Sequence, residues 1–338
     1  MDKVLNVGVI GAGRIARVHA ATLTYRLPNA RVAAIADVNL AAAQEAAAHF
    51  NIPVATDDPG QVFADPAIDA VLVCSITSTH APFIVAAAKA GKHIFCEKPI
   101  ALDLAQIDEA LAAVDAAGVK LQVGFNRRFD ANFARVRKAV AEGEIGRPAI
   151  LHIISRDPGP PPIEYAKGSG GMFLDMTIHD FDMARFLVGA EVEEIYTQAA
   201  VTVDPAIGAI GDVDTAVILM KFADGVIGTI DNCRRASYGY DQRVEVLGSK
   251  GAIATANNYP NAATISDGTS VRRDLPLNFF MDRYTESFAT EVAAFVDAVL
   301  HDKPTPVTGH DGRVPVVMGL AALKSHREGR PVKLAEIG

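Results

Sequence analysis

Two short segments of the sequence carry side chains that could move a proton or stabilise a developing negative charge. In Glu97-Lys98-Pro99, the lysine could donate hydrogen bonds to a substrate oxygen and favour its alkoxide form. In a helix predicted over 172–188, Asp175 and His179 are four residues apart, a spacing that places both side chains on one face. The aspartate could then orient the imidazole, whose other ring nitrogen could accept a hydroxyl proton. Each segment also has a purely structural interpretation. Glu97 and Lys98 could be a surface pair before a turn, and Asp175 and His179 could only stabilise their helix. Position in the sequence does not decide between structure and function in either case.

A metal site is not predicted. Asp180 and Asp182 follow the histidine, but no further ligand is identified that would converge with them. The cysteines Cys74, Cys96 and Cys233 are far apart in the chain, and none belongs to a C-x-x-C pair. They are typical of buried thiols in a reducing compartment rather than of disulfides or a zinc site.

A glycine-rich turn near the N-terminus predicts a dinucleotide site. Gly11, Gly13 and Ala16 form the pattern G-x-G-x-x-A between a predicted strand and a predicted helix. The first glycine permits a tight turn, the second lets the backbone approach a pyrophosphate, and the alanine allows close helix–strand packing. The next predicted strand ends at Asp37, 24 residues after Gly13, where a carboxylate would bind the adenosine ribose hydroxyls.

Asp37 also indicates which dinucleotide is bound. Its carboxylate would repel a 2′-phosphate, and Val38 and Asn39 supply no cation to offset that charge, so NAD is favoured over NADP. Arg14 could still reach a phosphate, which leaves use of both cofactors open. The predicted cofactor-binding residues are Gly11, Gly13, Arg14, Ile15, Asp37, Ser75, Ile76, Thr77, His80, Glu97 and Lys98.

The order of predicted elements indicates an α/β chain of two domains. A length of 338 residues suggests about two domains. Strands and alanine-rich helices alternate through residues 1–123, which predicts a parallel sheet and an N-terminal Rossmann dinucleotide-binding domain. Strands follow one another in residues 124–338 with hairpin signals between them, which predicts an α+β domain with an open, largely antiparallel sheet.

Composition excludes several classes of function. Lys and Arg number 32 against 40 Asp and Glu, a net charge of −8, and no basic run interrupts the acidic surface, so nucleic-acid binding is not expected. No uncharged apolar stretch is long enough for a transmembrane helix. The N-terminal residues enter a strand without an apolar signal segment, so we expect a cytoplasmic protein.

Several segments together resemble the Gfo/Idh/MocA oxidoreductases over essentially the whole chain. Besides the glycine loop, the most specific segments are Glu97-Lys98-Pro99, Arg127-Arg128-Phe129-Asp130, 170–180 and Tyr238-Gly239-Tyr240-Asp241. Within that family the similarity is greatest to inositol 2-dehydrogenases. The resemblance implies a Rossmann domain followed by an open mixed sheet whose outer face forms dimers and tetramers, so a homotetramer is expected.

The resemblance also implies roles for individual residues. It assigns Lys98, Asp175 and His179 to catalysis, and adds Arg128, Asp157 and Tyr240 to these three as contacts to a polyol. The implied reaction is NAD-dependent oxidation of a secondary hydroxyl of a cyclitol, myo-inositol to 2-keto-myo-inositol.

Two alternatives remain open. The segment 155–157 reads Ser-Arg-Asp, whereas related inositol dehydrogenases can carry His and Asn there, so a sugar such as an aldose, scyllo-inositol or an anhydro-sugar is an alternative substrate. A non-catalytic NAD(H)-sensing protein is the alternative from another class. A sensor does not need a general base, so the presence of three candidate catalytic residues argues against this alternative.

Overall fold

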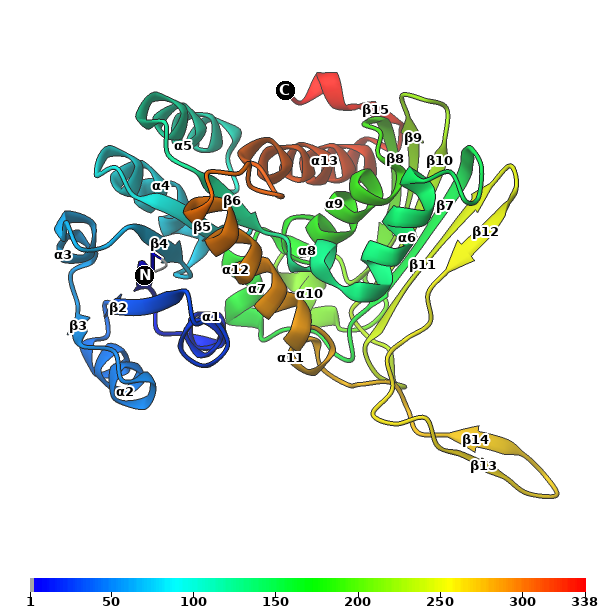
Figure 1. Cartoon of the computed structure of the whole chain (residues 1–338). Coiled ribbons are helices and arrows are strands. Elements are labelled where there is room, and N and C mark those ends of the chain that lie inside the picture. The colour runs from blue at the N-terminus through cyan, green and yellow to red at the C-terminus, as the bar shows by residue number, and fades with distance from the viewer. Residues whose placement is uncertain (1–2) are drawn as a thin grey trace. The chain divides into compact units, whose positions relative to one another are not determined.

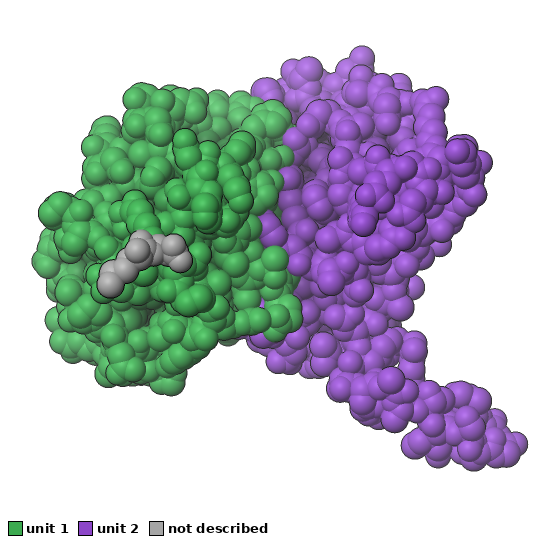
Figure 2. All heavy atoms as spheres, viewed as in Figure 1, with its two compact units in different colours: residues 1–126, 286–314 green, residues 127–285, 315–338 purple. Residues whose placement is uncertain are grey.

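The computed structural model describes residues 3–338, so the expectation for the first two residues lies outside the described chain. The chain forms two compact units, one of residues 1–126 and 286–314 and the other of residues 127–285 and 315–338 (Figure 2). The sequence predicts two continuous domains, 1–123 and 124–338, with a single boundary between them. In the structure, residues 286–314 instead return to the first unit, because Val292, Phe295 and Val296 are buried in its core.

The first unit is built on a six-stranded parallel sheet with the order β3-β2-β1-β4-β5-β6 (Figure 1). This strand order is that of the Rossmann fold, which confirms the predicted fold of the N-terminal part. The strands are β1 Leu5–Ile10, β2 Ala30–Ala36, β3 Val54–Thr56, β4 Ala70–Val73, β5 His93–Glu97 and β6 Leu121–Gly124. The main helices are α1 Arg14–Tyr25, α2 Leu40–Phe50, α3 Pro59–Ala64, α4 His80–Lys89, α5 Leu104–Ala117 and α12 Thr285–Leu300.

Local sequence signals explain where these elements start and stop. The Asp103 side chain caps α5 by accepting a hydrogen bond from the Gln106 backbone N–H at 3.1 Å. Gly118 ends the same helix in the left-handed region, with φ of 64°. All four residues of β4 are buried, which agrees with the continuous apolar run in the sequence.

The second unit contains a seven-stranded sheet with the order β12-β11-β7-β10-β9-β8-β15. Only β7 and β10 pair in parallel, so the expected largely antiparallel sheet is confirmed for the described residues. Its strands are β7 Pro148–Arg156, β8 Val192–Ala200, β9 Thr215–Phe222, β10 Ile227–Cys233, β11 Asp241–Gly248, β12 Gly251–Ala254 and β15 Val332–Lys333. The helices are α6 Ala131–Ala141, α7 Ile163–Gly168, α8 Gly171–Asp175, α9 Thr177–Val188, α10 Pro205–Ala209, α11 Phe280–Arg283 and α13 Gly309–Glu328, which extends across the boundary of the units.

The two faces of this sheet differ in exposure. On one face α9 packs against β7 and β10. Along β9, buried and exposed residues alternate, which is the period of a sheet covered on one side. On its other face Val217 and Leu219 are 56% and 45% exposed, and Ile227 of β10 is 50% exposed. The outer face therefore presents apolar side chains to the surroundings.

A hairpin arm, defined as residues 255–280, extends from the body of the second unit (Figure 1). It carries the short strands β13 Thr264–Ser266 and β14 Val271–Arg273, both of them exposed. Throughout residues 3–338, no helix combines the length and the apolar character that crossing a membrane requires.

Candidate active site

The glycine loop after β1 leaves room for a phosphate group. Gly11 has φ of 107°, and a Cβ atom there would lie 2.6 Å from the Cys74 carbonyl oxygen, so only glycine fits. A Cβ atom on Gly13 would meet nothing within 4 Å. Gly13 precedes α1, and no side chain of the described residues caps that helix. The backbone N–H groups at the start of α1 therefore suit an anionic pyrophosphate.

Asp37 follows β2 and is tied to this loop. Its Oδ2 accepts a hydrogen bond from the Ala12 backbone N–H at 2.7 Å, and its Oδ1 accepts one from the Asn39 backbone N–H at 2.9 Å. A carboxylate has lone pairs beyond these two bonds and can still accept ribose hydroxyls. The adjacent Val38 side chain is 91% exposed and brings no positive charge. These features fit NAD.

The loop after β4 supplies further predicted cofactor residues. The Ser75 and Thr79 hydroxyls are 2.7 Å apart, and Ile76 is 72% exposed at the start of a 3₁₀ turn that contains Thr77. His80 is different, because it is buried.

His80 contacts the backbone of two loops, and its role in binding the cofactor stays a prediction. Its Nδ1 lies 2.8 Å from the Pro99 carbonyl oxygen, and its Nε2 lies 3.1 Å from the Ser75 carbonyl oxygen. Burial lowers the pKa of His80, although both backbone contacts oppose that shift. The ring thus joins the turn after β4 to the turn after β5.

Glu97 ends β5, and Lys98 and Pro99 follow at the carboxyl edge of the parallel sheet, where open α/β sheets bind their ligands. The Lys98–Pro99 peptide bond is cis. The Lys98 side chain is half-buried, and the Glu97 Oε1 lies 2.7 Å from Nε2 of His19. The same sheet edge therefore carries the predicted lysine and the predicted cofactor loops.

In the second unit, Asp175 is held by two residues that sequence reasoning did not identify. Tyr165 donates a hydrogen bond to Asp175 Oδ1 at 2.9 Å, and Arg234 Nη2 lies 3.4 Å from Asp175 Oδ2. Arg234 is only 2% exposed and also lies 3.9 Å from Asp157. A buried guanidinium thus joins two carboxylates that the resemblance assigned to one site. No local signal in the sequence distinguishes Arg234 from the adjacent Arg235.

The Asp157 carboxyl group has a raised pKa. Burial is the main cause that raises the pKa of Asp157, to about 6, and the charges of Asp175 and Asp180 act in the same direction. Arg234 and Arg127 oppose the shift. A carboxyl group that titrates near neutrality in a cluster of charged groups is typical of functional sites.

A second buried polar cluster surrounds Asp180. Arg127 donates to Asp180 Oδ1 at 2.6 Å and to the Tyr240 hydroxyl at 3.3 Å. Asn232 donates to Asp180 Oδ2 at 2.9 Å. Burial raises the pKa of Asp180, and it raises the pKa of Tyr240 well above its ordinary value, so the tyrosine keeps its hydroxyl proton at neutral pH.

Arg128 lies in a different environment from the one expected. Its guanidinium donates to both Asp182 oxygens at 2.6–3.0 Å and lies 5.3 Å from the centre of the Phe186 ring. Arg127, not Arg128, contacts Tyr240, because adjacent residues of the 3₁₀ turn Asn126–Phe129 point in different directions. The polyol contact that the resemblance implies for Arg128 stays a prediction, and the structure adds Arg127 as the arginine that contacts Tyr240.

The continuous helix predicted over 172–188 is also wrong. The chain forms α8 and α9, interrupted at Met176, and the Thr177 hydroxyl donates to Asn232 Oδ1 at 2.6 Å at the start of α9. Asp175 and His179 are therefore not on one regular helix. His179 is half-buried and is flanked on both sides by buried residues of α9.

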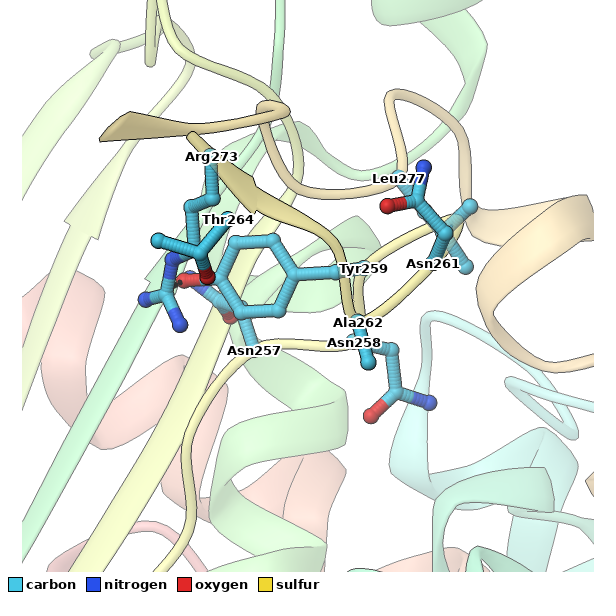
Figure 3. Close-up of a pocket in the computed structure, with 8 residues that line it drawn as sticks. All are labelled: Asn257, Asn258, Tyr259, Asn261, Ala262, Thr264, Arg273 and Leu277. Atoms are coloured by element: carbon cyan, nitrogen blue, oxygen red, sulfur yellow. Dashed lines mark hydrogen bonds between the residues drawn. The ribbon is translucent and has the colours of Figure 1, made fainter. Parts of the chain in front are cut away.

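A separate hollow in the second unit lies in the hairpin arm (Figure 3). There the Arg273 guanidinium stacks 3.8 Å from the centre of the Tyr259 ring. The residues that line the hollow are Asn257, Asn258, Tyr259, Asn261, Ala262, Thr264, Arg273 and Leu277, all of them described and none of them a predicted site residue.

Comparisons with known proteins agree with this architecture. Residues 5–125 match the model of the oxidoreductase family with an NAD-binding Rossmann fold, and residues 133–254 match the GFO/IDH/MocA C-terminal domain. The chain is 47% identical to a myo-inositol 2-dehydrogenase of Thermotoga maritima, over 98% of this chain and 99% of the relative. It is 46% identical to an inositol 2-dehydrogenase of Rhizobium meliloti, over 97% and 98% of the two chains.

Solved structures give the same result. A scyllo-inositol dehydrogenase of Lactobacillus casei with bound NAD(H) and scyllo-inositol is similar with a TM-score of 0.92 and 28% identity, over 98% of this chain and all of the other. The glycine loop, Asp37 and the strand order described above are the features expected of such an NAD-binding fold. The chain thus belongs to the Gfo/Idh/MocA family of oxidoreductases, with an NAD-binding Rossmann domain.

Proposed function

We propose that this protein is an inositol 2-dehydrogenase, which oxidises myo-inositol to 2-keto-myo-inositol with NAD. The observation that carries the proposal is the 47% identity, over nearly all of both chains, to a protein named myo-inositol 2-dehydrogenase. The substrate is a neutral polyol, so its recognition depends on hydrogen bonds rather than on the net charge of the protein.

Each chemical task is assigned to a residue of this chain. Bound NAD supplies the acceptor for the hydride that leaves the carbon. Lys98 donates a hydrogen bond to the reacting hydroxyl oxygen and stabilises its developing negative charge. Nδ1 of His179 is buried, so Nε2 is the atom that accepts the hydroxyl proton in this proposal.

The other groups of the second unit orient the substrate in this proposal. Asp157 and Asp175 accept hydrogen bonds from neighbouring hydroxyls, and Tyr240 donates its phenolic proton. The negative charge of Asp175 also favours the imidazolium of His179 in this proposal. The bonds of Tyr165 and Arg234 to Asp175 support this role by fixing the carboxylate before substrate arrives.

scyllo-Inositol is the second candidate substrate. A protein of Bacillus subtilis named scyllo-inositol 2-dehydrogenase (NAD(+)) is 36% identical over 99% of this chain. In the segment that departs from related inositol dehydrogenases, Ser155 bonds Gln242 and Arg156 bonds Asp231, which leaves Asp157 in the acidic cluster. Asp157 is thus the residue of this segment whose carboxylate would distinguish one cyclitol from another in this proposal.

A substrate screen tests the function. Purified protein is mixed with NAD or NADP and with myo-inositol, scyllo-inositol or glucose, and reduced cofactor is followed by absorbance. We expect the highest kcat/KM with NAD and myo-inositol. Turnover of glucose alone would contradict the cyclitol assignment. Binding of NAD without turnover of any polyol would instead indicate the sensor.

The assembly is proposed to be a homotetramer that forms through the outer face of the second sheet. The exposed apolar residues Val217, Leu219 and Ile227 on that face support this, because covering apolar side chains with a protein partner is favourable. The hairpin arm adds Ile265 and Val271, which are 57% and 73% exposed. A cytoplasmic location is proposed as well, supported by three cysteines that form no disulfide.

A further inference from the structure

A buried cluster of ionisable side chains lies in the first unit, behind the turn that carries Lys98. It consists of His19 from α1, Glu97 from β5 and Glu291 from α12, and one side-chain oxygen or nitrogen atom of each lies within 4.8 Å of those of the other two. His19 and Glu291 have no exposed surface. The sequence gives no sign that these three residues meet, because they lie in distant parts of the chain.

Glu291 has the less usual environment of the two carboxylates. Both of its side-chain oxygens are buried, and neither has a hydrogen-bond partner among the described residues. Its backbone carbonyl oxygen accepts a hydrogen bond from Gln122 at 2.8 Å, which anchors α12 to β6. Glu97, in contrast, contacts His19 at 2.7 Å.

No lysine or arginine is among the described groups that surround the Glu291 carboxyl group. The titratable groups around it are Glu97, the thiol of Cys74 and His19. The ring of His19 also packs against aromatic side chains, at 5.2 Å from Phe95 and 6.0 Å from Phe288. An unpaired carboxylate in such an apolar site, beside a second carboxylate, is strongly disfavoured.

The pKa of Glu291 also favours its protonated form. Burial, with a smaller contribution from the charge of Glu97, raises the pKa of Glu291 well above its usual range. Burial also raises the pKa values of Cys74 and Cys96, so these thiols stay neutral at physiological pH.

We propose that Glu291 carries a proton in the folded protein and, together with His19, holds the Glu97 carboxylate in place. Both residues are then positioning residues for the turn Glu97-Lys98. The His19 ring donates to Glu97 from Nε2, and the Glu291 acid group donates its proton toward the same pair through one water molecule.

The location of Glu97 explains why its position matters. Glu97 is bonded directly to Lys98 along the chain, and its carboxylate is confined on the side of β6, since a Cβ atom on Gly124 would lie 3.0 Å from Glu97 Oε2. A carboxylate held by two donors and confined on a third side leaves little freedom to the backbone that presents Lys98. This link to catalysis rests on the proposed role of Lys98.

A divalent cation is the competing occupant, because one imidazole and two carboxylates are common zinc ligands. Ligand atoms around tetrahedral zinc lie about 3.3 Å apart. The observed 2.7 Å between His19 and Glu97 is instead a hydrogen-bond distance. The geometry thus favours a proton.

Infrared spectroscopy tests the proton directly and without turnover. We expect the wild-type protein at neutral pH to show the carbonyl stretch of a buried protonated carboxylic acid, and Glu291→Gln to lose that band. Glu286→Gln is the matched control, because Glu286 lies on the same helix, is exposed and pairs with Arg26. The proposal is wrong if the band survives in Glu291→Gln, or if the wild type holds a stoichiometric divalent metal that this variant loses.

Kinetics test the positioning role. Glutamine imitates a protonated glutamate, so Glu291→Gln should retain kcat and the pH profile of the wild type. Glu291→Met keeps the volume but not the polar end, and should lower kcat about tenfold with little change in the KM for inositol. Equal kcat in both variants, measured on folded protein, would remove the positioning role. If the wild type turns over no polyol, the proposed function fails, whereas the infrared result still decides where the proton lies.

Discussion

Asp37 Oδ2 accepts a hydrogen bond from the backbone N–H of Ala12 at 2.7 Å. This bond fixes the acidic residue at the end of β2 against the glycine loop after β1, so the two parts of the NAD site are one unit. The acid therefore acts on NAD in two ways, through its own oxygens and through the shape of the loop.

Replacing Asp37 should change the cofactor preference. Asp37→Ser with Val38→Arg removes the charge that repels a 2′-phosphate and adds a cation at a side chain that is 91% exposed. We expect the ratio of kcat/KM values for NAD and NADP to move toward NADP by about tenfold or more, since a charged hydrogen bond contributes about 1.5–3 kcal/mol. The single variant Val38→Arg is the control, and it should leave NAD preferred. An unchanged ratio in the double variant would show that Asp37 does not select the cofactor.

How far the sequence predicts the structure depends on whether a feature is local. The turn at Gly11 and the cap at Asp103 follow from rules that involve a few neighbouring residues, and the structure contains both. The alternation of strands and helices likewise predicts the parallel sheet of the first unit. Local rules thus predict this sheet, but they do not predict that residues 286–314 return to its core.

Contacts between distant segments were not predictable in this way. Arg234 meets Asp175 across 59 residues of sequence, and His19 meets Glu97 across 78. The choice between Arg127 and its neighbour depends on side-chain direction in a 3₁₀ turn, which spacing does not reveal. The sequence therefore predicts the candidate residues better than it predicts their partners.

Lys98→Met should affect the chemical step rather than cofactor binding. Methionine keeps most of the side-chain volume but cannot donate a hydrogen bond to the reacting oxygen. We expect kcat to fall by about 10²-fold or more, with the Kd for NAD nearly unchanged. Titration with NAD, followed by steady-state kinetics, separates the two quantities. Lys89→Met, at the exposed end of α4, is the control. A loss confined to NAD affinity would make Lys98 a cofactor residue only.

His179→Ala should remove the general base. We expect kcat to fall by about 10²-fold or more, and the remaining activity to lose the wild-type dependence on pH. His301→Ala provides a control, because His301 is an exposed residue whose Nδ1 lies 2.9 Å from the Asp297 carboxylate. Nearly normal turnover of the His179 variant across the pH range would assign the proton transfer to another group.

Leu219→Asp should weaken the proposed assembly. The substitution places a charge among the apolar side chains of the outer sheet face, where it would be costly to bury in an interface. Light scattering after size exclusion should show a smaller species than the wild-type tetramer. Tyr25→Asp, at a side chain of α1 that is 63% exposed, should leave the mass unchanged. A tetrameric Leu219→Asp protein would place the interface elsewhere.

The affinity for inositol should depend on pH through Asp157. Because the pKa of Asp157 is raised to about 6, its carboxyl group loses its proton as the pH rises through that value, and only then becomes a full acceptor for a substrate hydroxyl. The KM for myo-inositol should therefore fall between about pH 5 and 7, whereas Asp157→Asn should show a flat profile in this window.

Stability should show the opposite trend, and this provides an independent check. A carboxyl group whose pKa is higher in the folded than in the unfolded state binds more protons when folded. Its stabilising contribution is therefore complete below the unfolded pKa of about 4 and is lost as the pH rises through about 6. Thermal unfolding of the wild type relative to Asp157→Asn should reveal this loss as a Tm difference that grows in favour of the variant from about pH 4 to 7. A Tm difference that is constant with pH would mean that folding does not shift the pKa of Asp157, and the KM trend would then need another titrating group.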